Sequence, residues 1–226
     1  MRKDLCLICY VIFIFMYCFP TVKAHEINQK NNIIEEQADV GLSLGPIPDL
    51  TIETICYELY SIDSLCRKGL VVLVFTSTKC PVASQYTQRL NRMNKYYSNA
   101  SVIGIYSNHE DTVQAIAKHV REMGILFHTA KDFDGKLANQ LGATMTPQAF
   151  IIDQNRIIRY RGPVDDNRYA NRVREKHLQN AIDQLLNDQE ITVSQADSFG
   201  CTIHFPEEAN HTITYARHIA PIIQRN

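Results

Sequence analysis

The stretch Leu70-Val-Val-Leu-Val-Phe-Thr-Ser-Thr-Lys-Cys80-Pro81 decides the fold. Its first six residues are apolar without alternation, which is typical of a strand that is buried on both faces in a sheet covered by helices. Pro81 suits the first turn of a helix, because its missing N–H group would have no partner there. We therefore expect Cys80 at the junction between a central strand and the start of the next helix.

Cys80 is the strongest candidate for a reactive group. At a helix start, free backbone amides and the helix dipole favour the thiolate, which is the nucleophilic form of cysteine. The alternative is a buried, inert thiol. Ser77 and Thr78 could hydrogen-bond to the Cys80 sulfur, or they could simply cap the following helix. We include both hydroxyl residues with Cys80 in the candidate catalytic group.

The rest of the chain alternates strands and helices. The expected elements, in chain order, are a hairpin over 51–62, a strand over 70–76, a helix over 82–97, a strand over 101–107, a helix ending at Gly124, a strand over 125–128, a short helix to Leu141, a hairpin over 148–160 and a helix over 173–186. This order predicts an α/β fold with a central mixed β-sheet flanked by helices.

The two ends of the chain differ in composition from the middle. Residues 1–24 combine a charged start, an apolar run and small residues before Ala24, which is the pattern of a cleaved signal peptide. We therefore expect an exported protein, periplasmic or extracellular, without a membrane anchor after cleavage; an uncleaved anchor is the alternative. Residues 25–46 are predicted to be a linker, 47–188 the folded domain and 189–226 a C-terminal tail.

The charge balance narrows the choice of partners. Removal of residues 1–24 takes away three of the 23 basic residues and one of the 24 acidic residues, which leaves a net charge of −3. Such a chain has no basic field, so we expect no nucleic-acid partner. The pair Cys201 and His204 offers only two ligands, whereas a closed metal site needs three or four. We predict neither a metal nor a cofactor.

Four cysteines remain after cleavage, and four cysteines allow three complete pairings in an oxidising compartment. Cys56 and Cys66 are close enough in sequence to bridge a hairpin with a disulfide. Cys80 and Cys201 would then form a second pair or remain as two free thiols. Cys201 is therefore a candidate resolving cysteine for Cys80, although about 120 residues separate the two.

Several motifs resemble the thioredoxin-like superfamily, and within it the redoxin branch that contains the alkyl hydroperoxide reductase and thiol-specific antioxidant proteins. The resemblance covers roughly residues 47–186. The motifs are Phe75-Thr-Ser-Thr-Lys-Cys80-Pro81, Lys131-Asp-Phe-Asp-Gly135, Leu141-Gly-Ala-Thr-Met-Thr146-Pro147, Phe150-Ile-Ile-Asp153 and Tyr160-Arg-Gly162 with Asp165-Asp166. In that family the proline matching Pro147 is cis and faces the reactive cysteine. The resemblance therefore implies that Thr146 and Pro147 form the wall opposite Cys80.

The chain departs from this family pattern at three places. Ala83 stands where the second cysteine of a Cys-x-x-Cys motif would be, and a lone thiol cannot release a mixed disulfide by itself. Ser77 stands where peroxiredoxins have threonine, and no arginine occurs over 144–153. The chain is most similar to a single-cysteine, peroxiredoxin-like group, which implies a peroxide or disulfide substrate and a thiol reductant. The alternative is a non-catalytic binding or electron-transfer module.

The C-terminal stretch suggests a further partner. Residues 212–226 resemble the segment that leads into a c-type haem domain. The Cys-x-x-Cys-His motif that would attach the haem does not follow, so no haem is predicted in this chain. The resemblance implies a cytochrome c domain as a partner, in a fusion of which this chain would be the redoxin part.

Overall fold

A computed structural model describes residues 46–205, and the predicted signal peptide and residues 206–226 lie outside this range. The strands are β1 (Thr51–Glu53), β2 (Leu59–Ser61), β3 (Leu70–Thr76), β4 (Ala100–Tyr106), β5 (His128–Lys131), β6 (Met145–Thr146), β7 (Gln148–Ile152), β8 (Ile158–Gly162) and β9 (Cys201–Thr202). The helices are α3 (Ile62–Cys66), α4 (Pro81–Ser84), α5 (Thr87–Tyr96), α6 (Val113–Met123), α7 (Lys136–Leu141), the 3₁₀ helix η1 (Ala170–Arg172) and α8 (His177–Leu186).

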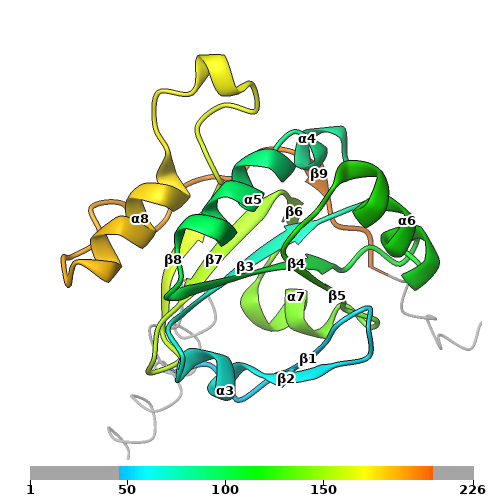
Figure 1. Cartoon of the computed structure of the whole chain (residues 1–226), viewed down its shortest axis with the longest axis horizontal. Coiled ribbons are helices and arrows are strands. Elements are labelled where there is room, and N and C mark those ends of the chain that lie inside the picture. Colours follow the sequence, from blue (N-terminus) through cyan, green and yellow to red (C-terminus); the bar gives the residue numbers. More distant parts are fainter. Residues whose placement is uncertain (1–45, 206–226) are drawn as a thin grey trace, which may run out of the picture. The chain divides into compact units, whose positions relative to one another are not determined.

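The central sheet has five strands in the order β5-β4-β3-β7-β8 (Figure 1). Strand β3 lies in the middle, parallel to β4 and antiparallel to β7, so the sheet is mixed. All but the last residue of β3 are buried, as its unbroken apolar run predicts. The predicted α/β fold with a mixed, helix-flanked sheet is confirmed.

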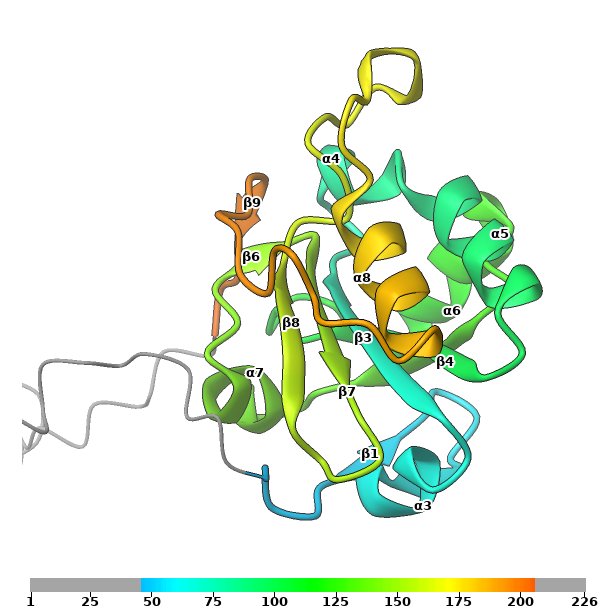
Figure 2. The same ribbon diagram turned by 90° about the vertical axis from the view of Figure 1, so that its left-hand side faces the viewer.

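Helices cover both faces of this sheet (Figure 2). Alternate residues of β3, such as Val72 and Val74, pack with Leu90 of α5 and Ile182 of α8 on one face. Helix α6 lies on this same side, whereas α7 lies on the opposite side of the sheet. Phe75 belongs to the other alternate set of β3 side chains. The sheet is therefore the middle layer between two hydrophobic layers.

The register of the sheet places the site. Phe75, near the end of β3, pairs with Gln148, the first residue of β7. Because the two strands are antiparallel, the end of β3 and the start of β7 lie at the same edge of the sheet. The loop that carries Cys80 is thereby brought next to Thr146 and Pro147.

The predicted helix over 82–97 is divided into α4 and α5. The division falls at Gln85 and Tyr86, and Tyr86 is fully buried. Periodicity could not reveal this break, because Val82, Tyr86 and Leu90 keep the four-residue spacing of a continuous buried face.

Two other predicted boundaries were wrong. The strand predicted over 125–128 begins only at His128, since the side chain of Asn91 hydrogen-bonds to the backbone of Gly124 and Leu126. The helix predicted from residue 173 begins at His177, because Arg174 and Glu175 bond to Asp166 in the preceding loop.

The predicted end of the domain at residue 188 was also too early. The backbone of Arg161 in β8 bonds to Ser194 and Ala196, and β9 then pairs with β6. Residues 189–205 are therefore part of the fold, and they carry Cys201 to the edge where Cys80 lies.

Candidate active site

Cys80 follows β3 after the short loop 77–79 and is the N-cap residue of α4, with Pro81 in the first turn. Its side chain is only 1% exposed. The backbone N–H of Ala83 donates to the Cys80 sulfur over 3.4 Å. The predicted position of Cys80 at a strand-to-helix junction is confirmed, and the free amide of the helix start is directed at the sulfur.

Cys201 lies against Cys80. The two Sγ atoms are 2.7 Å apart, and both residues are free thiols. Strand β9 brings Cys201 there by pairing antiparallel with β6, in a register that places Cys201 opposite Thr146. Cys201 is thus placed as a resolving cysteine would be, although the spacing of the two cysteines along the chain does not itself predict the contact.

Thr146 and Pro147 form the opposite wall of the site. Their peptide bond is cis, as the family resemblance implied. The Thr146 carbonyl oxygen lies 3.1 Å from the Cys80 sulfur, and the Thr146 hydroxyl donates to the Cys201 carbonyl over 3.3 Å. Thr146 therefore contacts both cysteines, one through its backbone and the other through its side chain.

Gly200 permits the close approach of β9 to this wall. Its φ of +149° is one that other residues rarely adopt. A Cβ atom at this position would stand 2.1 Å from the Thr146 carbonyl oxygen and 3.2 Å from Cδ of Pro147. Gly200 is not among the residues predicted from the sequence, where the Gly-Cys dipeptide is the one signal for it.

Residues 200–205, which we call the Cys201 segment, are held at both ends. Beyond the pairing with β6, the backbone N–H of His204 donates to Asn108 Oδ1 over 2.7 Å, and the N–H of His109 donates to the His204 carbonyl over 3.0 Å. The ring of Phe205 packs on Gly135, where a Cβ atom would stand 2.3 Å from it. The segment thus crosses the site and is tied to the loops after β4 and β5.

The predicted role of Ser77 and Thr78 was wrong in its detail. Both the N–H and the hydroxyl of Thr78 donate to the carboxylate of Asp111, which is fully buried. Ser77 accepts a bond from the N–H of Lys79. Within residues 46–205 neither hydroxyl bonds to the Cys80 sulfur, so both shape the loop before Cys80, and Asp111 anchors it.

The two sulfurs differ in acidity. Burial of Cys80 raises its pKa, but its hydrogen bonds with Cys201, with Thr146 and with the Ala83 amide outweigh burial and hold the pKa below the ordinary thiol value. Burial and the adjacent Cys80 sulfur raise the pKa of Cys201 to about 11. Cys80 is therefore the more acidic of the two sulfurs, and Cys201 loses its proton at a higher pH.

The disulfide considered between Cys56 and Cys66 is not formed. Cys56 is exposed in the turn between β1 and β2, whereas Cys66 is fully buried at the end of α3. Burial raises the pKa of Cys66 to about 11. A side chain directed into the core is not available to a partner on an exposed turn.

A cavity of about 260 Å³ opens beside the Cys80–Cys201 pair. Its lining residues are Ser77, Lys79, Cys80, Asn108, Glu110, Asp111, Cys201, Thr202 and His204. In the described range no group of three or more His, Cys, Asp or Glu side chains is placed to hold a metal ion. None of the described helices is long and apolar enough to cross a membrane.

The mixed sheet, the cysteine at the helix start and the facing cis-proline define the site of a thioredoxin-like redoxin. Residues 45–161 match the AhpC/TSA family, and the chain belongs to that family. It is 31% identical over 125 residues to the thiol:disulfide interchange protein DsbE of Escherichia coli (strain K12). This match covers 54% of the chain and 65% of the relative, so the chain spans less than two thirds of the length of DsbE.

Two solved structures match a larger part of the chain. A hypothetical protein from Sinorhizobium meliloti 1021 is 25% identical with a TM-score of 0.66, over 74% of this chain and 97% of that one. An uncharacterized conserved protein from Geobacillus kaustophilus is 24% identical with a TM-score of 0.67, over 75% and 96% of the two chains. Both matches cover about three quarters of the chain.

Proposed function

We propose that this protein is an exported thiol–disulfide oxidoreductase whose redox centre is the Cys80–Cys201 pair. The single observation that carries the proposal is the 2.7 Å separation of the two sulfurs. This distance lies between the covalent S–S bond length of about 2.05 Å and an ordinary non-bonded contact, so only a small shift is needed to form a disulfide. Cys201 therefore takes the part that the second cysteine of a Cys-x-x-Cys motif would play, with Ala83 at the vacated position.

The reaction proceeds in two exchanges. The Cys80 thiolate attacks one sulfur of a substrate disulfide, which forms a mixed disulfide and releases the other sulfur as a thiolate. Cys201 gives its proton to that leaving thiolate and then attacks the Cys80 sulfur. This step forms the Cys80–Cys201 disulfide and releases the second substrate sulfur as a thiolate, which takes a proton from water. The substrate disulfide gains two electrons, the cysteine pair loses two, and a thiol reductant restores the pair.

The substrate approaches where the Cys201 segment now lies. The edge of β6 is occupied by β9, so Thr146 offers its backbone to the protein's own strand. An extended substrate segment would have to displace the Cys201 segment from this edge before its sulfur could reach Cys80. Cys201 then returns to resolve the mixed disulfide.

Disulfide exchange is favoured over peroxide reduction. Stabilisation of the departing peroxide oxygen needs hydrogen-bond donors or cations at the reacting sulfur. The residues lining the cavity beside Cys80 include no arginine, and the lining cation, Lys79, pairs with Glu110. The neighbour in contact with the Cys80 sulfur is another thiol, which suits exchange between sulfurs.

Oxidation of the reduced mature protein with glutathione disulfide tests the proposal. We expect a loss of two hydrogens in intact mass and a peptide map that joins Cys80 to Cys201. In Cys201→Ser a glutathione adduct should persist on Cys80, whereas Cys56→Ser should behave as the wild type. A linkage between other cysteines would refute the proposal. A rapid gain of one oxygen with stoichiometric hydrogen peroxide, but no reaction with glutathione disulfide, would identify a peroxidase instead.

Export is part of the proposal, because a pair that cycles through a disulfide suits an oxidising compartment. The signal-peptide pattern of residues 1–24 supports it, and the expected mature N-terminus is His25. Residues 212–226 resemble the segment that leads into a c-type haem domain, so a cytochrome c domain is a candidate redox partner besides the thiol reductant. Amino-terminal sequencing of secreted material tests the cleavage site.

A further inference from the structure

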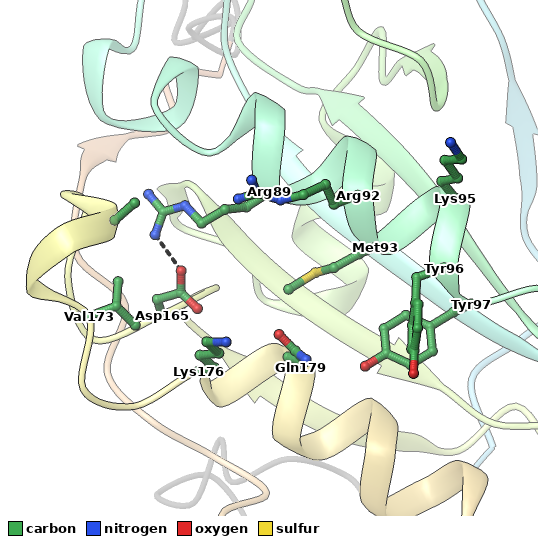
Figure 3. Close-up of a pocket in the computed structure, with 11 residues that line it drawn as sticks. Arg89, Arg92, Met93, Lys95, Tyr96, Tyr97, Asp165, Val173, Lys176 and Gln179 are labelled. Carbon is green, nitrogen blue, oxygen red and sulfur yellow. Dashed lines mark hydrogen bonds and ion pairs between the residues drawn. The ribbon is translucent and has the colours of Figure 1, made fainter.

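A second cavity, of about 750 Å³, lies between α5, the connection from β8 to α8, and α8 itself (Figure 3). Its lining residues include Arg89, Arg92, Met93, Tyr96, Asp165 and Lys176. None of them lines the cavity beside Cys80. The volume falls in the range of sites that enclose small organic ligands.

The lining of this cavity is strongly cationic, although the mature chain is acidic overall. The one acidic lining residue, Asp165, already forms an ion pair with Arg89, and both side chains are largely buried. Arg92, Lys95 and Lys176 also line the cavity. Within residues 46–205 none of these three forms an ion pair. The cavity therefore has uncompensated positive charge that favours an anion.

Asp165 supplies a second and independent sign of a ligand. The residue is 1% exposed, and its Oδ1 atom has no hydrogen-bond partner within the described part of the chain. A buried acceptor without a partner is costly and rare in native proteins. Figure 3 shows this second carboxylate oxygen facing the space between Met93 and Lys176. A hydroxyl or N–H group on a bound molecule would satisfy it.

The remaining lining is apolar and aromatic. Met93 and Tyr97 are buried, and the Tyr97 hydroxyl donates to Asp183, which holds its ring in place. Tyr96 is 78% exposed. Its ring stands edge-on to that of Tyr97, with 4.9 Å between the two ring centroids. An exposed aromatic ring next to a buried thioether provides a surface for a flat apolar group.

We propose that this cavity is a binding site for a small organic anion that has a flat apolar body and a hydroxyl or N–H donor. Arg92 and Lys176 bind the anionic group, Asp165 accepts from the donor, and Met93 and Tyr96 contact the body. The site is separate from the cysteine pair, so it does not depend on the proposed redox function.

The dye 8-anilinonaphthalene-1-sulfonate has all three features: a sulfonate, an N–H group and fused aromatic rings. We expect the dye to bind saturably to the folded mature protein, and its fluorescence measures the binding. The double variant Arg92→Gln/Lys176→Gln should bind at least about tenfold more weakly, because two charge-assisted hydrogen bonds are lost. Phenyl phosphate should displace the dye, whereas inorganic phosphate should not, since it lacks the apolar body.

Two matched controls make the test specific. Arg121→Gln/Lys136→Gln removes the same charge from α6 and α7, and should leave binding unchanged. Tyr96→Ala should weaken binding about threefold, whereas Tyr57→Ala, at a tyrosine of similar exposure in the β1–β2 turn, should not. Thermal melts establish that each variant is folded. Non-saturable binding, or equal affinity of the wild type and Arg92→Gln/Lys176→Gln, would overturn the proposal.

Discussion

The two cysteine pairs of this protein behave in opposite ways. Cys56 and Cys66 are near each other in sequence, yet one is exposed on a turn and the other is buried. Cys80 and Cys201 are 121 positions apart, yet their sulfurs are separated by 2.7 Å. The difference shows that closeness along the chain is a poor guide to sulfur chemistry. Strand pairing decides which cysteines come into contact.

The contrast has a simple structural cause. Cys66 ends a short helix whose buried side packs behind β3, so its thiol is enclosed. Cys201 lies on a two-residue strand that pairs with β6, and β6 directly precedes β7 beside the end of β3. Cys66 is buried in the core while Cys56 is exposed, so the two thiols do not share a surface. Cys80 and Cys201 meet where β9 pairs with β6.

Removal of the attacking thiol should have the largest effect. Cys80→Ser should lower the rate of reduction of insulin disulfides with dithiothreitol by at least about a thousandfold, because a serine hydroxyl cannot form the mixed disulfide. Cys56→Ser, at the exposed member of the other pair, should keep the wild-type rate. Equal losses in both variants would abolish the distinction between the pairs.

Removal of the resolving thiol should have the next largest effect. Cys201→Ser should lower the same rate by at least about tenfold, since resolution then depends on an external thiol rather than on one already in contact. The mixed disulfide on Cys80 should accumulate and be visible in intact mass. Undiminished turnover without such an adduct would show that Cys201 takes no part in the cycle.

A smaller effect on disulfide formation is expected from a substitution that moves the Cys201 segment away from Cys80 but keeps both thiols. Gly200→Ala places a methyl group against the Thr146 carbonyl, at a cost of about 1–3 kcal/mol. Formation of the Cys80–Cys201 disulfide, measured by quenched mass analysis, should slow by about fivefold or more. Gly124→Ala is the matched control, because Gly124 also has a positive φ but a Cβ atom there meets nothing within 4 Å.

The control separates two causes. Both substitutions place a side chain at a positive φ, so both should lower stability, and Gly200→Ala should lower it more because its φ is further from the αL region that Gly124 adopts. Only Gly200→Ala should change the rate of disulfide formation. If both variants slow the formation of the Cys80–Cys201 disulfide equally, Gly200 is not the residue that lets the Cys201 segment approach Thr146.

The smallest effect is on the pH dependence. Because the pKa of Cys80 is lowered, its thiolate should persist below the ordinary thiol range, whereas Cys66 and Cys201 should titrate near 11. A lowered pKa stabilises the folded state above the ordinary pKa, and this contribution is lost as the pH falls through the folded value. The ultraviolet absorbance of thiolates should show an early step in the reduced wild type.

Cys80→Ser should lack that early step and the matching loss of stability in denaturant titrations. If instead the first thiolate to form survives in Cys80→Ser and disappears in Cys201→Ser, the two sulfurs have the opposite order of acidity.

Much of the fold could be predicted because it depends on local patterns. The unbroken apolar run of β3, the Cys80-Pro81 junction and the glycine that ends α6 each reflect burial or backbone preference within a few residues. The break at Tyr86 could not be predicted, since the buried spacing continues through it. The start of β5 at His128 depends on the side chain of Asn91, which comes from another helix.

The chain by itself determined that Cys80 sits at a strand-to-helix junction and what kind of sheet carries it, since both follow from residues adjacent in sequence. Only the tertiary structure decided which thiol would face Cys80. It placed Cys201 there because an unpaired strand edge at β6 accepts any extended segment that can approach it, and Gly200 lets this segment approach. Hydrogen bonding at a sheet edge acts across any sequence distance, so no pattern in the chain could reveal it.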